Sequence, residues 1–348
     1  MADNDIVRLG IIGCGAIAEF AYLPAAQHLR QAQVVALADK NIGRARMLAE
    51  RHNIGTWVDD YRQLPQDLDG VIIALPHDLH APVATEFLQH HTAVLVEKPL
   101  ALTIPEAEKV IEVARANKTL LQVGQIYRFC HRAQMVKRAV EQGWIGNLRS
   151  FSLEGNFADT NPMASGFAWD KKRSGGGTLM DVGSLVLDLL MWWFGDPVRV
   201  EYSDDSLGGV ECDCELNLEF QNARGTISGK VILSRLRKLR DIVRIDADRL
   251  SIVYGFETNQ GLLELIPADK DWQVPFLLDV RSVPHQSHID FFAEQLKNFA
   301  IAIRAPEKSG APAESVLPSL ALIEQCYQTR RPLKYPWDVE QAAVPQVA

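Results

Sequence analysis

The sequence has few cysteines, and they show no pairing pattern. Its 348 residues include five cysteines, an odd number, at positions 14, 130, 212, 214 and 326. A disulfide framework or a zinc site needs cysteines at paired, regular spacings. Cys212 and Cys214 alternate with acidic residues, as on one face of a strand, and no second pair accompanies them. The pattern argues against a metal site and a secreted scaffold, and it favours a reducing compartment.

The chain also lacks an excess of positive charge and lacks long apolar runs. Its net charge of -8 argues against nucleic-acid binding, which concentrates positive charge. The apolar runs fall short of the ~20 residues that cross a membrane, and the polar, acidic start differs from an export signal. One short basic run, Arg235 to Arg240, is expected to be a solvated strand and turn. We therefore expect a cytoplasmic protein with neither nucleic acid nor membrane as partner.

What the sequence does contain is an alternation of strand-like runs and helical segments from Ile6 to about Gly124. This rhythm predicts a doubly wound parallel sheet of the Rossmann type. The expected helices include Ile42 to His52 and Ile104 to Asn117. The expected strands are Arg8 to Ile12, Val34 to Ala38, Gly70 to Ala74, Ala93 to Glu97 and Leu120 to Gly124.

Beyond about Tyr127 the pattern changes to one typical of an α+β domain with an open, mostly antiparallel sheet. We therefore divide the chain into a dinucleotide-binding domain (residues 1–125), a substrate-binding and oligomerisation domain (126–335) and a C-terminal tail (336–348). In the second domain the expected helices are Ala133 to Gln142, Thr178 to Phe194, His288 to Arg304 and Ala313 to Arg330. Its expected strands are Arg149 to Phe157, Val198 to Tyr202, Glu211 to Phe220, Gly225 to Leu233 and Ile242 to Ala247.

A glycine-rich turn follows the first expected strand. It reads Gly13-Cys14-Gly15-Ala16-Ile17-Ala18 and precedes a helical segment, which is the context that makes this motif informative. Gly13 permits the tight turn, Gly15 lets the backbone approach a pyrophosphate, and the helix start favours phosphate charge. We expect Gly13, Gly15, Ala16 and Ile17 to bind a dinucleotide.

Asp39 ends the second expected strand, where a carboxylate can accept hydrogen bonds from the adenosine ribose. This favours NAD over NADP. Lys40 and Arg44 follow closely and could instead neutralise a 2′-phosphate, so NADP remains open as the cofactor.

Together with the glycine turn, four further segments resemble the glucose-fructose oxidoreductase, inositol dehydrogenase and rhizopine catabolism family, called Gfo/Idh/MocA. They are Pro76-His77-Asp78-Leu79-His80, Glu97-Lys98-Pro99-Leu100, Tyr127-Arg128-Phe129 and the stretch from Gly175 to Gly183. The likeness extends over nearly the whole chain. It implies hydride transfer between NAD(P) and a hydroxyl or keto carbon of a sugar, cyclitol or related polyol, and a homodimer or homotetramer.

Lys98 stands at the carboxyl end of an expected parallel strand, where open α/β sheets bind their ligands. A cation there could polarise a carbonyl or exchange a proton with the substrate oxygen. A surface ion pair with Glu97 is the plain alternative. The resemblance implies that Lys98 is catalytic and that Pro99 positions the nicotinamide. It also implies that Leu75, Pro76, His80 and Glu97 line the cofactor cleft.

Asp181, Leu185 and Asp188 are spaced to share one face of the expected helix. The resemblance implies a catalytic aspartate at 181 and, four residues later, a histidine acid/base, but this chain has Leu185 there. Three explanations stay open. Lys98 or Tyr127 moves the proton, which we favour; or the protein is a weak or inactive NAD(P)-binding sensor or regulatory module; or the substrate presents a less polar group to Leu185.

Substrate contacts are expected from Asp181, Leu185, Arg128 and Trp169. An arginine at the start of the second domain could orient a hydroxyl or carboxylate, although a structural ion pair explains Arg128 equally well. Trp169 precedes the triple glycine on what is either a pocket rim or a solvated loop. His77 and His80 lie three residues apart, but no further ligands accompany them, so we expect no metal.

Overall fold

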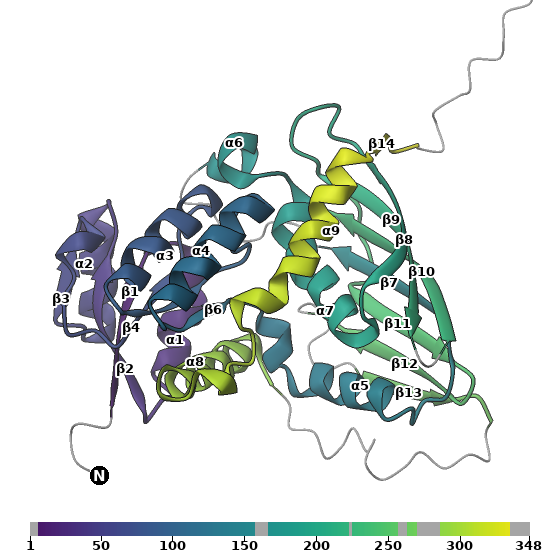
Figure 1. Cartoon of the computed structure of the whole chain (residues 1–348), viewed down its shortest axis with the longest axis horizontal. Helices are drawn as coiled ribbons and strands as arrows, with labels where there is room; N and C mark the ends of the chain where they lie inside the picture. Colours follow the sequence, from purple (N-terminus) through teal and green to yellow (C-terminus); the bar gives the residue numbers. More distant parts are fainter. Residues whose placement is uncertain (1–5, 157–165, 223–224, 257–262, 270–285, 335–348) are drawn as a thin grey trace, which may run out of the picture.

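The computed structural model describes residues 6–156, 166–222, 225–256, 263–269 and 286–334. Two lobes lie side by side, each built on its own sheet (Figure 1). The expected tail at 336–348 lies outside the described residues.

The first lobe contains a six-stranded sheet in which every strand pair is parallel. Its order is β3-β2-β1-β4-β5-β6, the arrangement of a doubly wound dinucleotide-binding domain. The expected fold is confirmed, with one strand more than expected, because β3 is too short to show a periodicity. The strands are β1 (Val7–Ile12), β2 (Ala32–Ala38), β3 (Thr56–Val58), β4 (Gly70–Ile73), β5 (Ala93–Val96) and β6 (Leu121–Val123).

Helices cover this sheet because its central strands are apolar on both faces. All four residues of β4 and all four of β5 are buried, as continuous apolar runs in parallel sheets usually are. The strand order reverses between β1 and β4, and ligands of such sheets bind beyond the carboxyl ends at that point. The helices are α1 (Leu23–Ala26), α2 (Ile42–His52), α3 (His80–Gln89) and α4 (Ile104–Ala116).

The second lobe is a large, mostly antiparallel sheet of eight strands in the order β13-β12-β11-β7-β10-β9-β8-β14. Two of its pairs, β7 with β10 and β8 with β14, are parallel. The expected α+β lobe is confirmed, and β12 to β14 extend the sheet beyond the strands expected. The strands are β7 (Leu148–Asn156), β8 (Pro197–Asp204), β9 (Asp213–Asn222), β10 (Gly225–Ser234), β11 (Ile242–Ala247), β12 (Leu250–Gly255), β13 (Leu263–Pro267) and β14 (Arg331–Pro332).

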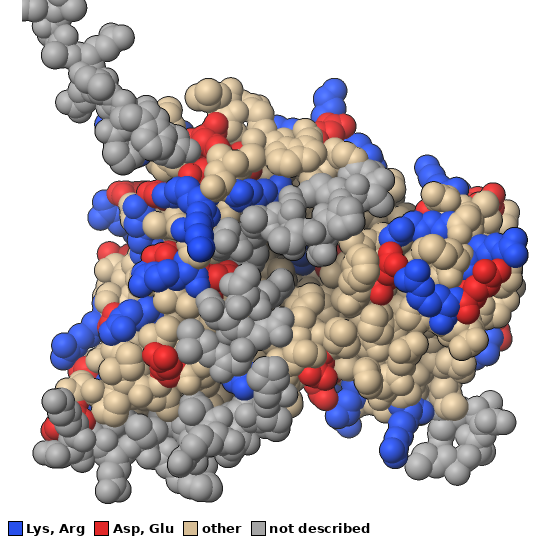
Figure 2. Space-filling model, turned by 180° about the vertical axis from the view of Figure 1, so that it is seen from behind, with Lys and Arg blue, Asp and Glu red and all other residues tan. Residues whose placement is uncertain are grey.

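One face of this sheet is covered by α5 (His131–Glu141), α7 (Ser184–Phe194) and α9 (Leu317–Gln328), as Figure 1 shows. On the face of the molecule seen in Figure 2, basic and acidic side chains are interspersed. Within β8, Arg199 and Glu201 form an exposed ion pair at 2.7 Å. Such exposed pairs contribute little stability.

Helix α8 (His288–Arg304) comes late in the chain but packs against α1 of the first lobe (Figure 1). Phe292 on α8 meets the ring of Tyr22 edge-on at 4.9 Å between centroids. A methyl group on Gly70 of β4 would come within 3.1 Å of Phe299. The C-terminal part of the chain therefore stabilises the dinucleotide-binding lobe.

The triple glycine and Glu211 together form the start of the buried helix in the second lobe. A Cβ at Gly177 would lie 1.9 Å from the carbonyl oxygen of Glu211, so no larger residue fits. The buried Glu211 carboxylate accepts bonds from the backbone N–H groups of Gly177 and Leu179, both at 2.9 Å. A carboxylate at a helix N-terminus satisfies amides that lack helical partners.

A π-helical turn, η7 (Leu179–Gly183), leads from these glycines into α7. The helical segment Lys171–Phe194 has 24 residues and contains a window apolar enough to cross a membrane, but 78% of that window is buried inside the protein. It serves as the core helix of the second lobe.

Candidate active site

The glycine turn has the shape that a dinucleotide requires. Gly13 has φ +96°, and a Cβ there would lie 2.3 Å from the carbonyl oxygen of Ala74, so the turn admits only glycine. At Gly15 a Cβ would meet no atom within 4 Å. The protein itself therefore does not require glycine at 15, whereas close approach of a phosphate to this backbone would. Ala16 and Ile17 continue the turn into the following helix.

Asp39, at the end of β2, lies against this turn. Its carboxylate accepts bonds from the backbone N–H groups of Cys14 at 2.7 Å and Asn41 at 2.8 Å. Arg44 donates to the Cys14 carbonyl and to Glu19, the latter at 2.8 Å, while Lys40 is exposed. The site thus offers a fixed carboxylate at the turn, which fits an adenosine ribose, and Arg44 is already engaged by an acidic partner.

His80 connects the loops that follow β4 and β5. The ring is fully buried, and its two nitrogens lie 2.7 Å from the Pro99 carbonyl and 2.8 Å from the Leu75 carbonyl. Burial lowers the pKa of His80, while these carbonyls act in the opposite direction. His80 thereby holds the segments that carry Leu75, Pro76 and Pro99 beside each other. The peptide bond between Lys98 and Pro99 is cis.

Glu97 precedes Lys98 but does not pair with its ammonium group. The carboxylate is buried, accepts a 2.6 Å bond from the Tyr22 hydroxyl and lies 3.2 Å from the Lys98 backbone nitrogen. Burial raises the pKa of this carboxyl. The surface ion pair considered as an alternative for Lys98 is therefore wrong. Glu97 faces the helix that follows the glycine turn, rather than open space in the cleft.

Lys98 reaches across to the second lobe. Its ammonium group donates to the carbonyl oxygen of Asp181 at 2.8 Å and to the carboxylate of the same residue. An ammonium has three N–H donors. Within the described part of the chain these are its partners, so one N–H remains for another acceptor. The structure thus brings Lys98 and Asp181, two residues named separately as catalytic candidates, into direct contact.

Asp181 has a second cationic partner, Arg235, which follows β10. The guanidinium donates to the other carboxylate oxygen at 2.6 Å, and its side chain is only 5% exposed. The expectation of a solvated turn at Arg235 is wrong, because this contact depends on which strands pair and where they end. Although burial acts to raise the pKa of Asp181, the charges of Lys98 and Arg235 hold it well below its usual range.

Trp169 stands at the rim of this cluster. Its side chain is 57% exposed, and the Arg235 guanidinium carbon lies 5.8 Å from the centre of its ring. An aromatic face over a guanidinium contributes about 0.5–1 kcal/mol at exposed sites. The exposed side chain of Trp169 is compatible with both positions considered for it, a pocket rim and a solvated loop, and its ring contacts the Arg235 guanidinium.

His77 lies in the same cleft, between the lobes. Its Nδ1 donates to the carbonyl of Ser174 at 2.9 Å, and its ring meets Phe167 edge-on at 5.1 Å. Burial lowers the pKa of His77 to about 3, so the ring is neutral near pH 7. Among the described residues, no group of three or more His, Cys, Asp and Glu side chains is placed to hold a metal ion.

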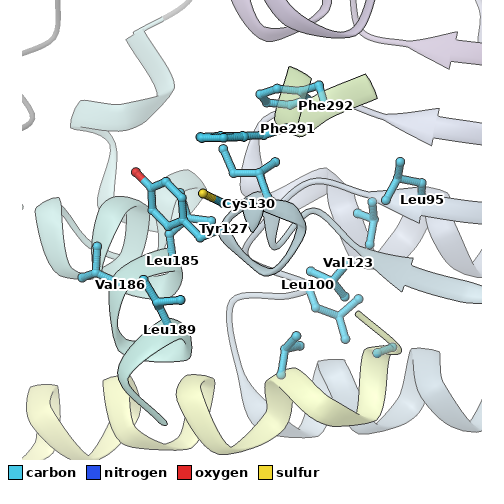
Figure 3. Packing of buried hydrophobic residues seen from close by; sticks show 14 of the residues in the cluster. Leu95, Leu100, Val123, Tyr127, Cys130, Leu185, Val186, Leu189, Phe291 and Phe292 are labelled. Atoms are coloured by element: carbon cyan, nitrogen blue, oxygen red, sulfur yellow. The ribbon is translucent and has the colours of Figure 1, made fainter. Parts of the chain in front are cut away.

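Leu185 and Tyr127 belong to one cluster of buried apolar side chains (Figure 3). Leu185 is 9% exposed and lies one turn after Asp181, and Tyr127 is 2% exposed with its ring 5.3 Å from that of Phe256. Tyr127 is thus a buried side chain of the apolar cluster, packed against Phe256.

Arg128 is buried in a structural ion pair. Two of its nitrogens contact the carboxylate of Asp188 at 2.8 and 2.6 Å, and a third contacts the Ser315 hydroxyl at 2.7 Å. The substrate role expected for Arg128 is not supported by this placement. Asp188 likewise faces Arg128, so the shared face expected for Asp181 and Asp188 does not bring them to one site.

Comparison with known proteins agrees with this geometry. Residues 7–125 match the model described as an oxidoreductase family with an NAD-binding Rossmann fold, and residues 133–248 match the GFO/IDH/MocA C-terminal domain. The chain belongs to the Gfo/Idh/MocA family. It is therefore an oxidoreductase with an NAD-binding Rossmann domain, and the resemblance, the fold and the nicotinamide cofactor expected from the sequence are confirmed.

Individual members of the family are similar to the chain over most of its length. A dTDP-3,4-didehydro-2,6-dideoxy-alpha-D-glucose 3-reductase of Saccharopolyspora spinosa is 29% identical over 93% of this chain and 98% of its own. An inositol dehydrogenase homolog from Azotobacter vinelandii complexed with NAD+ has TM-score 0.79 at 20% identity, covering 93% and 95%. KijD10, a 3-ketoreductase from Actinomadura kijaniata in complex with TDP-benzene and NADP, has TM-score 0.77 at 23% identity, covering 95% and 100%.

The neutral, buried His77 predicts a pH dependence of stability. Between its folded pKa of about 3 and its ordinary value of 6.5, the unfolded chain binds a proton that the folded ring does not. The free energy of unfolding therefore falls as pH drops through this range, by at most about 1.4 kcal/mol per pH unit. Urea unfolding at a series of pH values should show a shallower dependence in His77→Asn. The exposed control His90→Asn should keep the wild-type slope; equal slopes in all three proteins would contradict the assignment.

The buried pair of Arg128 and Asp188 predicts a loss of stability rather than of substrate affinity. Arg128→Leu leaves a buried carboxylate without its partner and should cost about 3–5 kcal/mol in urea unfolding. The double variant Arg128→Leu/Asp188→Leu should recover most of that loss, because no buried charge remains. An Arg128→Leu protein of unchanged stability but raised KM would instead make Arg128 a substrate residue.

Proposed function

We propose that this protein transfers a hydride between NAD(P) and a carbonyl or hydroxyl carbon of a sugar, cyclitol or related polyol, with Lys98 as the catalytic group. The observation that carries the proposal is the ammonium of Lys98 beyond the carboxyl end of β5, with two N–H donors on Asp181 and one left over. Ligands of doubly wound sheets bind at this end of the strands.

The substrate class is supported by what similar proteins act on. The 3-reductase works on a keto sugar nucleotide, and KijD10 is named as a 3-ketoreductase. Two elements of this chain suit a small polar ring. Lys98 supplies a cationic donor, and the exposed face of Trp169 at the rim supplies an apolar surface for C–H groups.

In the reduction direction the third N–H of Lys98 donates a hydrogen bond to the substrate carbonyl oxygen. A nicotinamide cofactor held by the glycine turn and Asp39 would supply the hydride for the carbonyl carbon. As negative charge develops on that oxygen, Lys98 Nζ stabilises it and gives up a proton, so an alcohol forms. Asp181 holds the ammonium at two points and fixes its direction. In the reverse direction a neutral Lys98 amine accepts the alcohol proton.

Lys98 is the better candidate for proton transfer in the absence of a histidine at 185. Leu185 has no titratable group, Tyr127 is packed in the core, and burial keeps His77 neutral and a weak base. The placement of Lys98 therefore supports the first of the three explanations for Leu185.

NAD is the cofactor favoured by the carboxylate of Asp39 at the end of β2. A 2′-phosphate beside it would be repelled, and Arg44 is paired with Glu19 at 2.8 Å. Tighter binding of NADH than of NADPH in calorimetry is the expected result, and the reverse would overturn this preference.

Lys98→Met tests the catalytic assignment. The variant keeps the length of the side chain without its charge, so turnover of a keto sugar or cyclitol, followed by the absorbance of NAD(P)H, should fall by about 10²–10⁴-fold. NADH affinity in calorimetry should stay near wild type. The exposed control Lys109→Met should change neither.

Two results would contradict the assignment, and they differ in meaning. Full turnover in Lys98→Met would remove Lys98 from the mechanism. Cofactor binding without turnover in the wild type, across a broad panel of ketones and polyols, would favour the sensor or regulatory module.

Leu185→His tests the placement of that position beside the reacting groups. The new imidazole would lie one helical turn from Asp181 and should add a titration to kcat/KM between about pH 5 and 8, where the wild type has none from a histidine. Leu185→Asn is the matched polar control, which cannot titrate. A pH profile identical in Leu185→His and wild type would show that position 185 does not contact the reaction.

A further inference from the structure

Asp181 is held from two directions by two cations that come from different lobes. Lys98 follows β5 of the first lobe and contacts one carboxylate oxygen, and Arg235 follows β10 of the second and contacts the other at 2.6 Å. Leu185, one turn later on the same helix as Asp181, can offer no hydrogen bond. The carboxylate is thus oriented by a residue that is distant in sequence.

The guanidinium of Arg235 is itself fixed in place. Its backbone nitrogen donates to the Cys212 carbonyl at 2.8 Å, its side chain is 5% exposed, and the ring of Trp169 lies over it. Four charged or titratable side chains interact electrostatically with Asp181. They are Lys98, His77, Arg235 and the acidic Glu97. Arg235 is the one of them that keeps its charge at every accessible pH.

We propose that Arg235 is a positioning residue for the reaction: it holds one oxygen of the Asp181 carboxylate so that the other oxygen meets Lys98 Nζ. The inference rests on the proposed function, since it gives Arg235 a part in the same site. Arg235 acts through Asp181 and needs no contact with the substrate.

A permanent charge distinguishes this arrangement from one that relies on a histidine. A neighbouring arginine lowers the pKa of an aspartate by about 1–3 units. With Arg235 replaced by glutamine, protonation of Asp181 moves to higher pH by that amount, and an uncharged Asp181 no longer orients the ammonium. Lysine at position 235 keeps the positive charge, so the pKa of Asp181 should stay low.

The first test needs no turnover. The Asp181 carboxyl carbon is followed by NMR in protein carrying ¹³C-labelled aspartate, with Asp181→Asn used to assign the signal. Arg235→Gln should raise the midpoint of its titration by about 1–3 pH units, and Arg235→Lys should stay near wild type. Arg240→Gln, which removes an exposed arginine of the same segment, should leave it unchanged. Equal titrations in wild type and Arg235→Gln would overturn the proposal.

The second test uses activity. Arg235→Gln should lower kcat about tenfold or more with cofactor KM unchanged, and should move the acidic limb of kcat to higher pH. Arg235→Gln/Asp181→Asn should be no slower than Asp181→Asn alone, because Arg235 works through that carboxylate. If the two substitutions together lower kcat by the product of their separate effects, the proposal is overturned. Absence of turnover in every protein would reject the proposed function, while the NMR titration still decides the role of Arg235.

If Arg235→Gln does not fold, Arg235→Lys and Trp169→Ala carry the test. Lysine retains the charge but presents it on one nitrogen instead of a planar guanidinium, so partial loss of kcat with an unmoved Asp181 titration is expected. Loss of kcat equal to that of Asp181→Asn, with a raised titration midpoint, would show that charge at 235 is not what holds the carboxylate.

Discussion

The site depends on one carboxylate that stays ionised in a partly exposed cleft between two lobes. Removing Asp181 from water costs free energy, and the charges of Lys98 and Arg235 offset that cost because each meets a separate oxygen. Lys98 comes from the first lobe, whereas Asp181 and Arg235 both belong to the second. The contact of Lys98 with Asp181 therefore joins the two lobes at the cleft, and the contact with Arg235 fixes the carboxylate within its own lobe.

Much of the first lobe was predictable because its signals are local. Buried parallel strands are continuous apolar runs, and the glycine turn is a short motif whose φ and close contacts only Gly13 satisfies. The unpredicted parts are those decided by distant segments. Arg235 resembles any arginine of a basic surface run until β10 is paired with β9 and its end is brought to the cleft. The role of Glu211 at the start of the buried helix was unpredictable for the same reason, because its partners Gly177 and Leu179 are distant in sequence.

The spacing of residues in the sequence also does not reveal in which direction a charged side chain points. Glu97, Lys98 and Arg128 were all candidates for the cleft, yet burial sends them to different partners. Glu97 turns to Tyr22, Arg128 to Asp188, and Lys98 alone crosses to Asp181. Helical spacing also does not tell whether two residues on one face share a site: Asp188 lies about 10 Å along the helix from Asp181 and pairs with Arg128 instead. The sequence shows which residues are charged, but it does not show which partner each of them contacts.

Because Leu185 cannot exchange a proton, another residue of the site must supply the proton that the reaction needs. A hydride transfer to a ketone needs one proton, and a site with lysine, aspartate and arginine contains a single group able to deliver it, because Asp181 remains ionised and a guanidinium does not release protons. Arg235 compensates for the missing histidine in charge but not in proton exchange. Such a site suits a reaction in which one proton moves directly between Lys98 and the substrate oxygen, and the lysine then recovers or releases it through solvent at the partly exposed cleft. A relay through a second residue would require a titratable side chain that faces this cleft, and the neutral His77, whose Nδ1 proton is committed to Ser174, offers only a weak acceptor.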